Sequence, residues 1–524
     1  MENVLSSKKS AAISVEELIL YGVKKNLITE LDSIFVRNRL FDLLKIEEPA
    51  IVEFEDTFIP DLHEIIGSLL IYAVEEGLIE DGITEKDLLD TKIMGLLTPM
   101  PSTVARDFFE LERERDSKAS TDYFYQLSQD VNYIRTDRIA KNKHWTVPTK
   151  YGEIEITINL SKPEKDPLLL KKNLNQVSTD YPKCVLCIEN MGFEGNVKRA
   201  ARENHRLIPL DLSGENWYLQ YSPYVYYNEH CILIYEDHKP MHVCRKTFDR
   251  LFEFLDRFPH YFIGSNTDLP IVGGSILEHE HYQGGCYKMP MVDAEICAYY
   301  TAEGYQRVSI GRLNWPLSSI RLSSTDKESV IDLAEKILNH WRMYDDESVG
   351  IYHESLENGV MTPHNTVTPI TRINEKCEYE IDIVLRNNRT SEEFPRGIFH
   401  PHPNLHHIKK ENIGLIEVMG LAILPGRLQE ETNMISEYLS GEKGEAELER
   451  LRDEDPLFKH REWIKEMMVN NGILGREEAI KLIKKEIGIK FTEVLEDAGV
   501  YKNNEQGEAA FNRFMKSCGF DKRF

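Results

Sequence analysis

The chain has 524 residues, of which 41% are hydrophobic and 10% aromatic, and its formal net charge is -25 at pH 7. This length exceeds the size at which one hydrophobic core usually stops growing, so we expect two or more domains, and the composition excludes a disordered chain. The acidic balance argues against a broad face for nucleic acid or membrane, and an anionic substrate would need a local basic cluster.

The N-terminus carries glutamates where the apolar segment of a secretory signal would lie, and no run approaches 18 apolar residues. Eight cysteines in so long a chain without such a signal indicate a reducing compartment, where most would be buried thiols. We therefore expect a cytoplasmic protein without a membrane span.

Residues 1 to about 130 are expected to form several helices, because apolar residues recur there at three- and four-residue spacing. This spacing appears in "SVEELILYGVKKNLI", "PDLHEIIGSLLIYAVEEGLI" and "VARDFFELERERD". The pattern changes at Glu153–Leu160, where Ile154, Ile156, Ile158 and Leu160 alternate with other residues. Strict alternation predicts a half-buried strand.

The middle of the chain, about 150 to 425, is expected to be a mixed α and β region with largely antiparallel strands. Strands are predicted at "CILIYED", "NWPLSSIRL" and "YEIDIVLRNN", and helices at "TFDRLFEFLDRF" and "VIDLAEKILNHWRMY". From about Gln429 the pattern is helical to the end. The fold class predicted is therefore α+β.

Thirteen of the 17 histidines lie between His230 and His407, so the chemistry is expected in the mixed middle. The segment "GGSILEHEHYQGG" is the richest part of it. On a strand, His279, His281 and Gln283 would share one face, because side chains alternate. The flanking glycine pairs would let a ligand or another backbone approach closely.

Three interpretations of this segment are open from the residues alone. The histidines could be structural, or they could share a metal, as histidines two apart on a strand can. They could also include a nucleophile, because a neutral imidazole can attack phosphorus and leave again. A neighbouring amide could then donate hydrogen bonds to the phosphoryl oxygens as charge develops.

The segment resembles the active-site strand of the histidine-triad superfamily, and its His-x-His-x-Gln pattern resembles the galactose-1-phosphate uridylyltransferase family within it, in its longer second class. The resemblance extends over blocks that span most of residues 120 to 427: "KCVLCIENMGFEG", "YSPYVYYNEHCILIYEDHKPM", "GSNTDLPIVGGSILEHEHYQGG", "TPHNTVTPI", "VLRNNRTSEEFPRGIFHPH" and "HHIKKENIGLIEVMGLAILPGRL". It implies two histidine-triad-like antiparallel halves, 121–300 and 301–428, between helical regions 1–120 and 429–524.

The family resemblance implies a cytoplasmic homodimer that transfers a uridylyl group from UDP-glucose to galactose 1-phosphate. His281 would be the nucleophile of a ping-pong reaction, and Gln283 would hold the transferred phosphoryl group. A nucleotide hydrolase or phosphorylase of the same superfamily is the alternative, although the Gln283 amide cannot donate a proton as an imidazolium can. A non-catalytic metal-binding or scaffold protein is a further alternative.

"KCVLC" contains Cys184 and Cys187, a pair that alone is ambiguous between zinc, redox chemistry and no function. The family resemblance implies a structural zinc held by this pair together with His238 and His279. His230 is an alternative to His238, because "NEHCILIYEDH" contains both.

"GIFHPHPNLHH" contains a second cluster of histidines. By resemblance, His400 and His402 would join His364 in a second metal site, such as an iron site, with Glu295 as the nearest candidate for a fourth ligand. The alternative is a hydrogen-bonded histidine cluster that shapes the substrate site.

Phosphate groups on both substrates call for guanidinium and ammonium partners. Taken singly, such residues are more often solvated surface charges, but several lie in the blocks that carry the resemblance. The predicted substrate-binding residues are Arg135, Arg138, Arg386, Arg389 and Lys410, with the polar residues Asn266 and Ser275.

Overall fold

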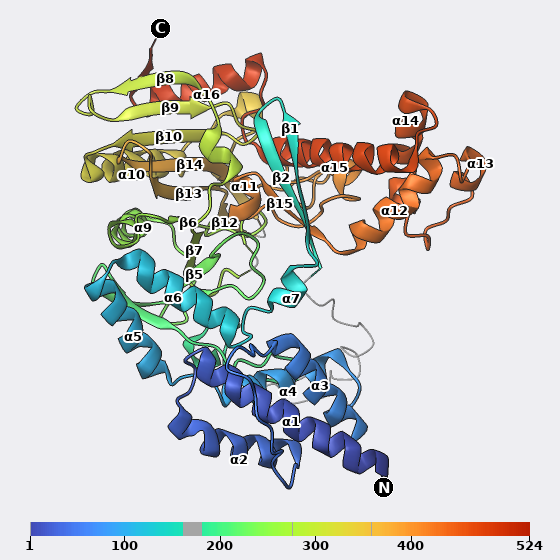
Figure 1. Ribbon diagram of the computed structural model, residues 1–524. Coiled ribbons are helices and arrows are strands. Elements are labelled where there is room, and N and C mark those ends of the chain that lie inside the picture. Colours follow the sequence, from blue (N-terminus) through green and yellow to red (C-terminus); the bar gives the residue numbers. More distant parts are fainter. Residues whose placement is uncertain (1, 161–180, 197, 275, 358, 524) are drawn as a thin grey trace.

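The computed structural model describes residues 2–160, 181–196, 198–274, 276–357 and 359–523, and helical regions flank a long central sheet (Figure 1). The predicted α+β class is confirmed. Within these ranges, no helix has the length and apolar character needed to cross a membrane.

The N-terminal region consists of helices, as the apolar spacing predicts. Its elements are α1 (Glu2–Lys24), α2 (Ser33–Leu44), α3 (Leu62–Glu75), α4 (Ile83–Gly95), α5 (Pro101–Glu114), α6 (Ser117–Asp130) and the single turn α7 (Thr136–Ile139). The start of α3 is fixed by Asp61, whose carboxylate accepts hydrogen bonds from two backbone N–H groups of the first turn. Helix α5 begins with Pro101, which lacks the N–H that would be unpaired there.

The central sheet has eleven strands, and every neighbouring pair is antiparallel. In chain order its strands are β3 (Ile208–Leu212), β4 (Glu215–Tyr221), β5 (Cys231–Tyr235), β6 (Phe262–Ser265), β7 (His281–Gly285), β8 (Ile296–Ala302), β9 (Ser309–Leu313), β10 (Ser319–Ser324), β13 (Asn365–Ile373), β14 (Tyr379–Asn387) and β16 (Phe520–Lys522). The spatial order is β16-β8-β9-β10-β14-β13-β6-β7-β5-β4-β3.

This order contains the same five-strand arrangement twice. The first half runs β3-β4-β5-β7-β6 and the second runs β8-β9-β10-β14-β13, so in each the fifth strand lies between the third and the fourth. Each half has one long helix between its third and fourth strands: α9 (Arg245–Arg257) and α10 (Lys327–Trp341). The two halves join where β6 pairs with β13. Strands β7 and β14 therefore occupy equivalent places.

Helices α9 and α10 cover one face of the sheet (Figure 1). Helix α9 buries Phe248, Leu251, Phe252, Phe254 and Leu255 there. The apolar face of α10, whose last residue is the buried Trp341, packs into the same core. The apolar residues that recur at helical spacing in the sequence thus form the core on this side of the sheet.

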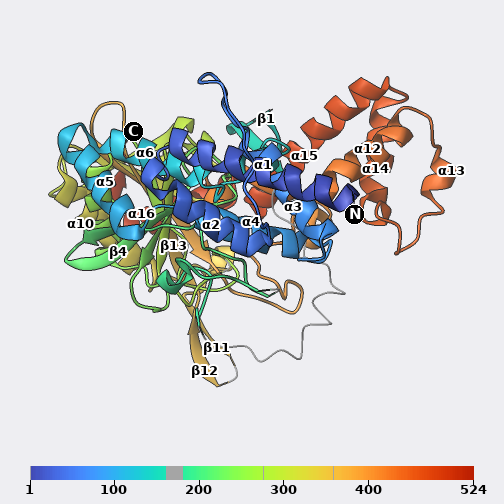
Figure 2. The same cartoon turned by 60° about the horizontal axis from the view of Figure 1, so that its bottom comes forward.

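The opposite face is covered by a three-stranded sheet, a short helix and the C-terminal region (Figure 1). These elements are β1 (Lys143–Thr149), β2 (Gly152–Asn159), β15 (Leu421–Pro425), α11 (Leu415–Val418), α12 (Arg427–Leu439), α13 (Glu445–Leu448), α14 (Arg461–Asn471) and α15 (Arg476–Ala498). The last helix, α16 (Glu505–Ser517), packs instead against α10 in the core on the other face. Strand β2 buries Ile154, Ile156 and Ile158, which confirms the strand predicted there. A separate hairpin, β11 (Glu354–Glu357) with β12 (Val360–Pro363), projects from the molecule (Figure 2).

The structure differs from the sequence-based expectations at three places. The C-terminal region is not helical to its end, because β16 pairs with β8 at the edge of the central sheet. The strand expected at residues 314–322 begins only at Ser319, since the preceding residues form the turn that contains Pro316. Strand β7 begins at His281, so His279 lies just before it.

Candidate active site and metal centre

Strand β7 lies between β5 and β6 in the first half of the sheet. Its His281 is opposite Ile234 of β5, and its Gln283 is opposite both Ile232 of β5 and Gly264 of β6. Alternation puts His281 and Gln283 on the face away from α9. A second pair, Glu280 and Tyr282, therefore faces the helix.

The helix side of this segment is held by a buried polar cluster. Arg250 of α9 donates hydrogen bonds to the Glu280 carboxylate at 2.8 Å and to the Tyr282 hydroxyl at 3.0 Å. The Tyr282 ring stacks on Trp217 of β4 with the ring centroids 4.6 Å apart. Strand β7 is thus anchored on one face, which leaves its other face to carry the chemistry.

His281 is 4% exposed, and its ring is oriented by the backbone. Its Nδ1 lies 2.8 Å from the carbonyl oxygen of His279, so Nδ1–H donates and the lone pair resides on Nε2. Burial lowers the pKa of His281 to about 4, which keeps the ring neutral at neutral pH. This is the protonation state that a nucleophilic imidazole needs.

Gln283 has a histidine partner from the neighbouring strand. The Nε2 atom of His230, just before β5, lies 3.2 Å from Oε1 of Gln283. His230 is therefore not placed as the alternative metal ligand. His238, six residues beyond Ile232, lies instead with the two cysteines.

Four ligating side chains converge beside the start of β7. Their ligand atoms all lie within 4.8 Å of one another: Cys184, Cys187, His238 and His279. The Sγ atoms of the two cysteines are 3.5 Å apart, and Nδ1 of His279 and of His238 each lie 3.3 Å from one of them. Ligands on a tetrahedral zinc would be separated by roughly 3.5–3.8 Å, so this set has the spacing of a metal site.

The groups around these ligands also suit a metal centre. His279 donates its Nε2–H to the carbonyl oxygen of Tyr235 at 2.8 Å, which turns Nδ1 toward the sulfur atoms, and such outer hydrogen bonds usually orient metal-bound histidines. The backbone N–H groups of Cys184 and Leu186 point at the two Sγ atoms, at 3.3 and 3.4 Å. The Asn190 amide closes the turn by donating to the carbonyl oxygens of Cys184 and Cys187, both at 2.8 Å.

The second predicted metal set does not converge. Among the described residues, the set beside β7 is the one group of three or more histidine, cysteine and acidic side chains close enough to share an ion, and neither the second histidine set nor Glu295 belongs to it. His364 forms hydrogen bonds with Ser355 and Asn388. His400 contacts the Pro401 carbonyl oxygen, and His402 contacts that of Ile398. Each of these three histidines is thus hydrogen-bonded to a group of the protein.

The arginines before β1 are already paired with carboxylates. Arg135 forms ion pairs with Asp87 and Asp90 of α4, at 2.5 and 2.9 Å, and Arg138 pairs with Asp87. These contacts tie α7 to the N-terminal helices. The structure therefore gives both guanidinium groups protein anions as partners.

Two of the remaining predicted substrate-binding residues, Arg386 and Asn266, contact the segment at the start of α11. Arg386 of β14 is 1% exposed and donates one hydrogen bond, to the Ile413 carbonyl oxygen at 3.0 Å, and its Nε and Nη1 have no acceptor among the described residues. Asn266 follows β6 and accepts the backbone N–H of Leu415 at 2.9 Å. Arg389 donates to Gly350, Lys410 is exposed, and Ser275 lies outside the described residues. Arg386 and Asn266 thus contact the same segment, from opposite sides of the β6–β13 junction.

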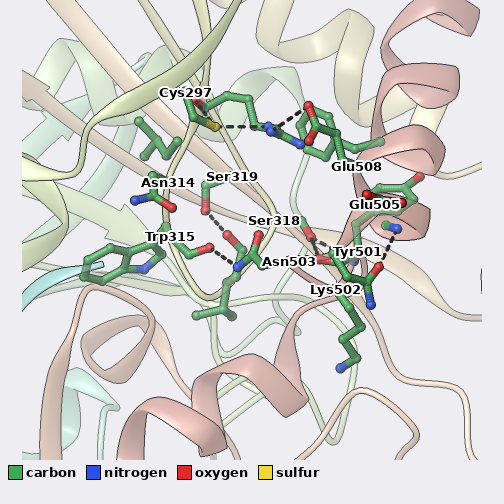
Figure 3. Close-up of a pocket in the computed structure, with 16 residues that line it drawn as sticks. Cys297, Asn314, Trp315, Ser318, Ser319, Tyr501, Lys502, Asn503, Glu505 and Glu508 are labelled. Atoms are coloured by element: carbon green, nitrogen blue, oxygen red, sulfur yellow. Dashed lines mark hydrogen bonds and ion pairs between the residues drawn. The ribbon is translucent and has the colours of Figure 1, made fainter. Parts of the chain in front are cut away.

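A polar pocket of about 320 Å³ lies elsewhere, between β9, β10 and the segment that leads into α16 (Figure 3). Arg312 reaches Glu508 at 3.2 Å across it, and Ser318 donates to the Tyr501 carbonyl oxygen. Asn503 donates to the Trp315 carbonyl oxygen at 3.0 Å. These bonds attach the C-terminal segment to the second half of the sheet, away from β7.

Two features of the site were not predicted from the sequence. The contact of His230 with Gln283 depends on the pairing of β5 with β7 across about fifty residues, which no local pattern reports. The clamp of Arg250 on Glu280 and Tyr282 is likewise a contact between a helix and a strand. The alternation of Glu280 and Tyr282 with the histidines is the one signal that these residues face the helix.

Two family descriptions match most of the chain. "Galactose-1-phosphate uridyl transferase, N-terminal domain" matches residues 26–240, and the C-terminal domain of the same description matches residues 253–446. The chain is 53% identical to the galactose-1-phosphate uridylyltransferase of Caldanaerobacter subterraneus subsp. tengcongensis, over 98% of this chain and 99% of that one. It is 49% identical to the enzyme of the same name from Bacillus subtilis (strain 168), over 96% and 97%. Among solved structures, yeast Ap4A phosphorylase Apa2 matches with a TM-score of 0.30 and 13% identity, over 59% of this chain and 89% of that one.

Proposed function

This chain belongs to the galactose-1-phosphate uridylyltransferase family, and we propose that it transfers the uridylyl group through a covalent bond to His281. As a member of that family it is a nucleotidyltransferase of galactose metabolism. The substrates we assign are UDP-glucose as donor and galactose 1-phosphate as acceptor. One observation carries the assignment to His281: its Nδ1–H is held by the His279 carbonyl oxygen, beside Gln283 on the same strand face.

In the first half-reaction, the Nε2 lone pair of His281 attacks the α-phosphorus of UDP-glucose. The N–P bond forms while the bond between the α-phosphorus and the bridging oxygen breaks, and glucose 1-phosphate leaves with that electron pair. The imidazole gains positive charge as the N–P bond forms, so its Nδ1–H bond to the His279 carbonyl becomes charge-assisted and stronger. The carbonyl thereby stabilises the intermediate without taking the proton.

In the second half-reaction, a phosphate oxygen of galactose 1-phosphate attacks the same phosphorus. The N–P bond breaks, its electron pair returns to Nε2, and UDP-galactose leaves. Both phosphate nucleophiles are already ionised at neutral pH, so the reaction needs positioning and charge stabilisation more than proton transfer. One nucleophile thus serves both directions.

The oxygens of the transferred group need donors close to His281. We assign this role to the Gln283 amide, because it shares the strand face of His281. For the sugar phosphate we assign Arg386, whose buried guanidinium group has two nitrogen atoms, Nε and Nη1, without an acceptor among the described residues, together with Lys410 and Asn266. Buried donors without acceptors are rare in proteins, and an anionic substrate would supply acceptors.

We assign zinc to the set of Cys184, Cys187, His238 and His279, because two thiols and two imidazoles at these separations suit a closed tetrahedral site. The ion would be structural. Its effect on the reaction would come through His279, whose backbone carbonyl orients His281.

A half-reaction isolates the covalent step. Incubation of the protein with UDP-glucose and labelled glucose 1-phosphate, without galactose 1-phosphate, is expected to move label into UDP-glucose, because the first half-reaction is reversible on its own. Absence of exchange would contradict a covalent intermediate. Sustained net release of glucose 1-phosphate without an acceptor would instead indicate the hydrolase of the same superfamily.

A further inference from the structure

His230 faces the active strand from the adjoining strand. Ile232 of β5 is opposite Gln283, so His230, two residues earlier, lies on the same face of the sheet and one step along it. Its Nε2 is 3.2 Å from Gln283 Oε1. The partner in this contact is a side-chain amide, which can flip by 180° because its O and NH₂ ends have nearly the same shape.

The burial of His230 fixes which of its nitrogens carries the proton. The residue is 2% exposed, and burial lowers its pKa to about 4, so the ring is neutral with a single N–H. Its Nδ1 is buried and has no hydrogen-bond partner among the described residues. A buried N–H without an acceptor is disfavoured more strongly than an unused lone pair, so the proton resides on Nε2. Nε2–H therefore donates to Gln283, and the atom that accepts is the amide oxygen.

The ring of His230 is also held in place. It stacks on the ring of Tyr226, with the centroids 5.4 Å apart, and packs against the tilted ring of Tyr227, with the centroids 4.6 Å apart. Its backbone carbonyl accepts from Ser222 N–H at 2.7 Å, and its own N–H donates to Tyr227. The neighbouring Glu229 is bound by the Tyr261 hydroxyl. A ring packed against two tyrosines and held through its backbone can impose its orientation on a partner, rather than follow it.

We propose that His230 is a positioning residue for uridylyl transfer: its Nε2–H holds the Gln283 amide oxygen, so that the amide presents its NH₂ group to the phosphoryl oxygens at His281. Without this donor the amide can rotate and present its carbonyl oxygen, which repels a phosphoryl oxygen. The inference rests on the proposed role of Gln283 and adds the reason that this amide binds an anion.

The test is a double-mutant cycle read in a single turnover with UDP-glucose. His230→Phe keeps an aromatic ring and removes the N–H donor. We expect it to slow formation of the covalent intermediate by about 10- to 100-fold. This slowing should not exceed that of Gln283→Ala, which we expect to be about 10²–10³-fold. Because the contact orients a group that acts in the transition state, the Kd of UDP-glucose should change by less than about 3-fold. His230→Gln, which keeps an N–H donor, should retain more of the rate.

In the Gln283→Ala background, His230→Phe should slow the reaction by no more than about 2-fold, because its partner is already gone. An equal slowing in both backgrounds would overturn the proposal. If Gln283→Ala reacts at nearly the wild-type rate, the role proposed for Gln283 fails first, which is a distinct outcome. His242→Phe, at an exposed histidine, is the matched control and should change neither rate nor affinity.

A second measurement does not depend on a variant that folds poorly. In the wild-type protein with ¹⁵N-labelled imidazoles, the His230 signals should report a protonated Nε2 and an unprotonated Nδ1 at neutral pH. His230→Gln, or His230→Phe if it folds, assigns the signal. A proton on Nδ1 would contradict the orientation of the amide.

Discussion

The two halves of the central sheet have the same strand order but different chemistry at the equivalent strand. In the first half, the face of β7 that points away from α9 carries His281 and Gln283. In the second half, β14 carries Asp382, which is 0% exposed and accepts hydrogen bonds from Arg321 and Arg372 of the adjoining strands. The same place in the fold therefore holds a reactive face in one half and an ion-pair network in the other.

This difference shows that the topology provides an equivalent strand in both halves, and that the side chains on the strand determine whether it carries reactive groups or an ion-pair network. On β14 the charge of Asp382 has fixed partners: burial alone would raise its pKa, but Arg321 and Arg372 outweigh burial and lower the pKa. On β7, the hydrogen bond of His281 is made by Nδ1 and that of Gln283 by Oε1, so each reactive side chain is held at one end only. The predictions below probe this contrast from the largest expected effect to the smallest.

Replacement of the nucleophile should have the largest effect. His281→Ala is expected to lower kcat by at least about 10⁴-fold, or about 5.5 kcal/mol, because no other side chain on this face of β7 can form the covalent bond. Steady-state rates measured with both substrates would report the loss. The thermal midpoint should stay close to that of the wild type, and a variant with more than about a tenth of the wild-type kcat would contradict the role of His281.

Replacement of the charge on the equivalent strand should act on stability. Asp382→Asn removes the buried anion that Arg321 and Arg372 share and leaves them only Glu380, and we expect the free energy of unfolding to fall by about 3–5 kcal/mol. Urea unfolding would measure the change. Asp122→Asn, which breaks the exposed pair with Lys118, is the control and should cost about 0–1 kcal/mol. Equal costs for the two variants would show that the β14 network is not a buried one.

How far the sequence could go is clearest around the same two strands. The shared face of His281 and Gln283 is expected from the alternation of side chains on a strand, whereas the roles of these residues and of His279 are implied by the family resemblance. The clustering of His279 with the cysteines and His238 is found in the structure. The second histidine set was expected from a similar pattern and does not converge, because "HPH" is followed by the short turn Pro403–Leu405 rather than placed on a strand. Two side chains that are two positions apart lie on the same face only if the backbone between them is extended.

Charged residues show the same limit. The binding of phosphate by Arg135 and Arg138 stays a prediction, and the sequence did not indicate that they pair with carboxylates about fifty residues earlier in the chain. Sequence spacing gives no distance between α4 and α7. The parts predicted well, such as β2, α9 and α10, are those in which one apolar period decides the structure.

Loss of a metal ligand should have an effect of intermediate size, and it should be confined to the metal site in the first half of the central sheet. Cys187→Ser is expected to weaken metal binding by at least about 10²-fold, so the purified protein should carry much less metal by elemental analysis. Cys297→Ser, at an exposed cysteine outside the cluster, should leave the metal content unchanged. Metal content that is equal in both variants would contradict the assignment of this site.

The smallest effect concerns acid stability of the second histidine region. The buried His407 contacts His460 at 2.8 Å, and burial, together with the positive field of His460, Lys490, Arg427 and Lys459, lowers its pKa to about 3. The unfolded chain takes up a proton near pH 6.5, whereas the folded residue stays neutral. Stability is therefore full above about pH 6.5 and falls as the pH drops, by about 1.4 kcal/mol at pH 5.5 for this residue.

Urea unfolding at pH 7.5 and pH 5.5 would test this contribution. The difference between the two pH values should be smaller in His407→Phe than in the wild type, by about the same 1.4 kcal/mol. An unchanged difference would mean that His407 is not held neutral in the folded protein.

The covalent adduct is the most direct test of the proposed reaction. The protein is incubated with UDP-glucose alone, quenched, digested and mapped by mass spectrometry. We expect a uridylyl group on the peptide that contains His281, removed on addition of galactose 1-phosphate with release of UDP-galactose, and no adduct in His281→Ala. An adduct on another residue, or turnover without any adduct in the wild-type protein, would contradict the proposal that His281 carries the uridylyl group.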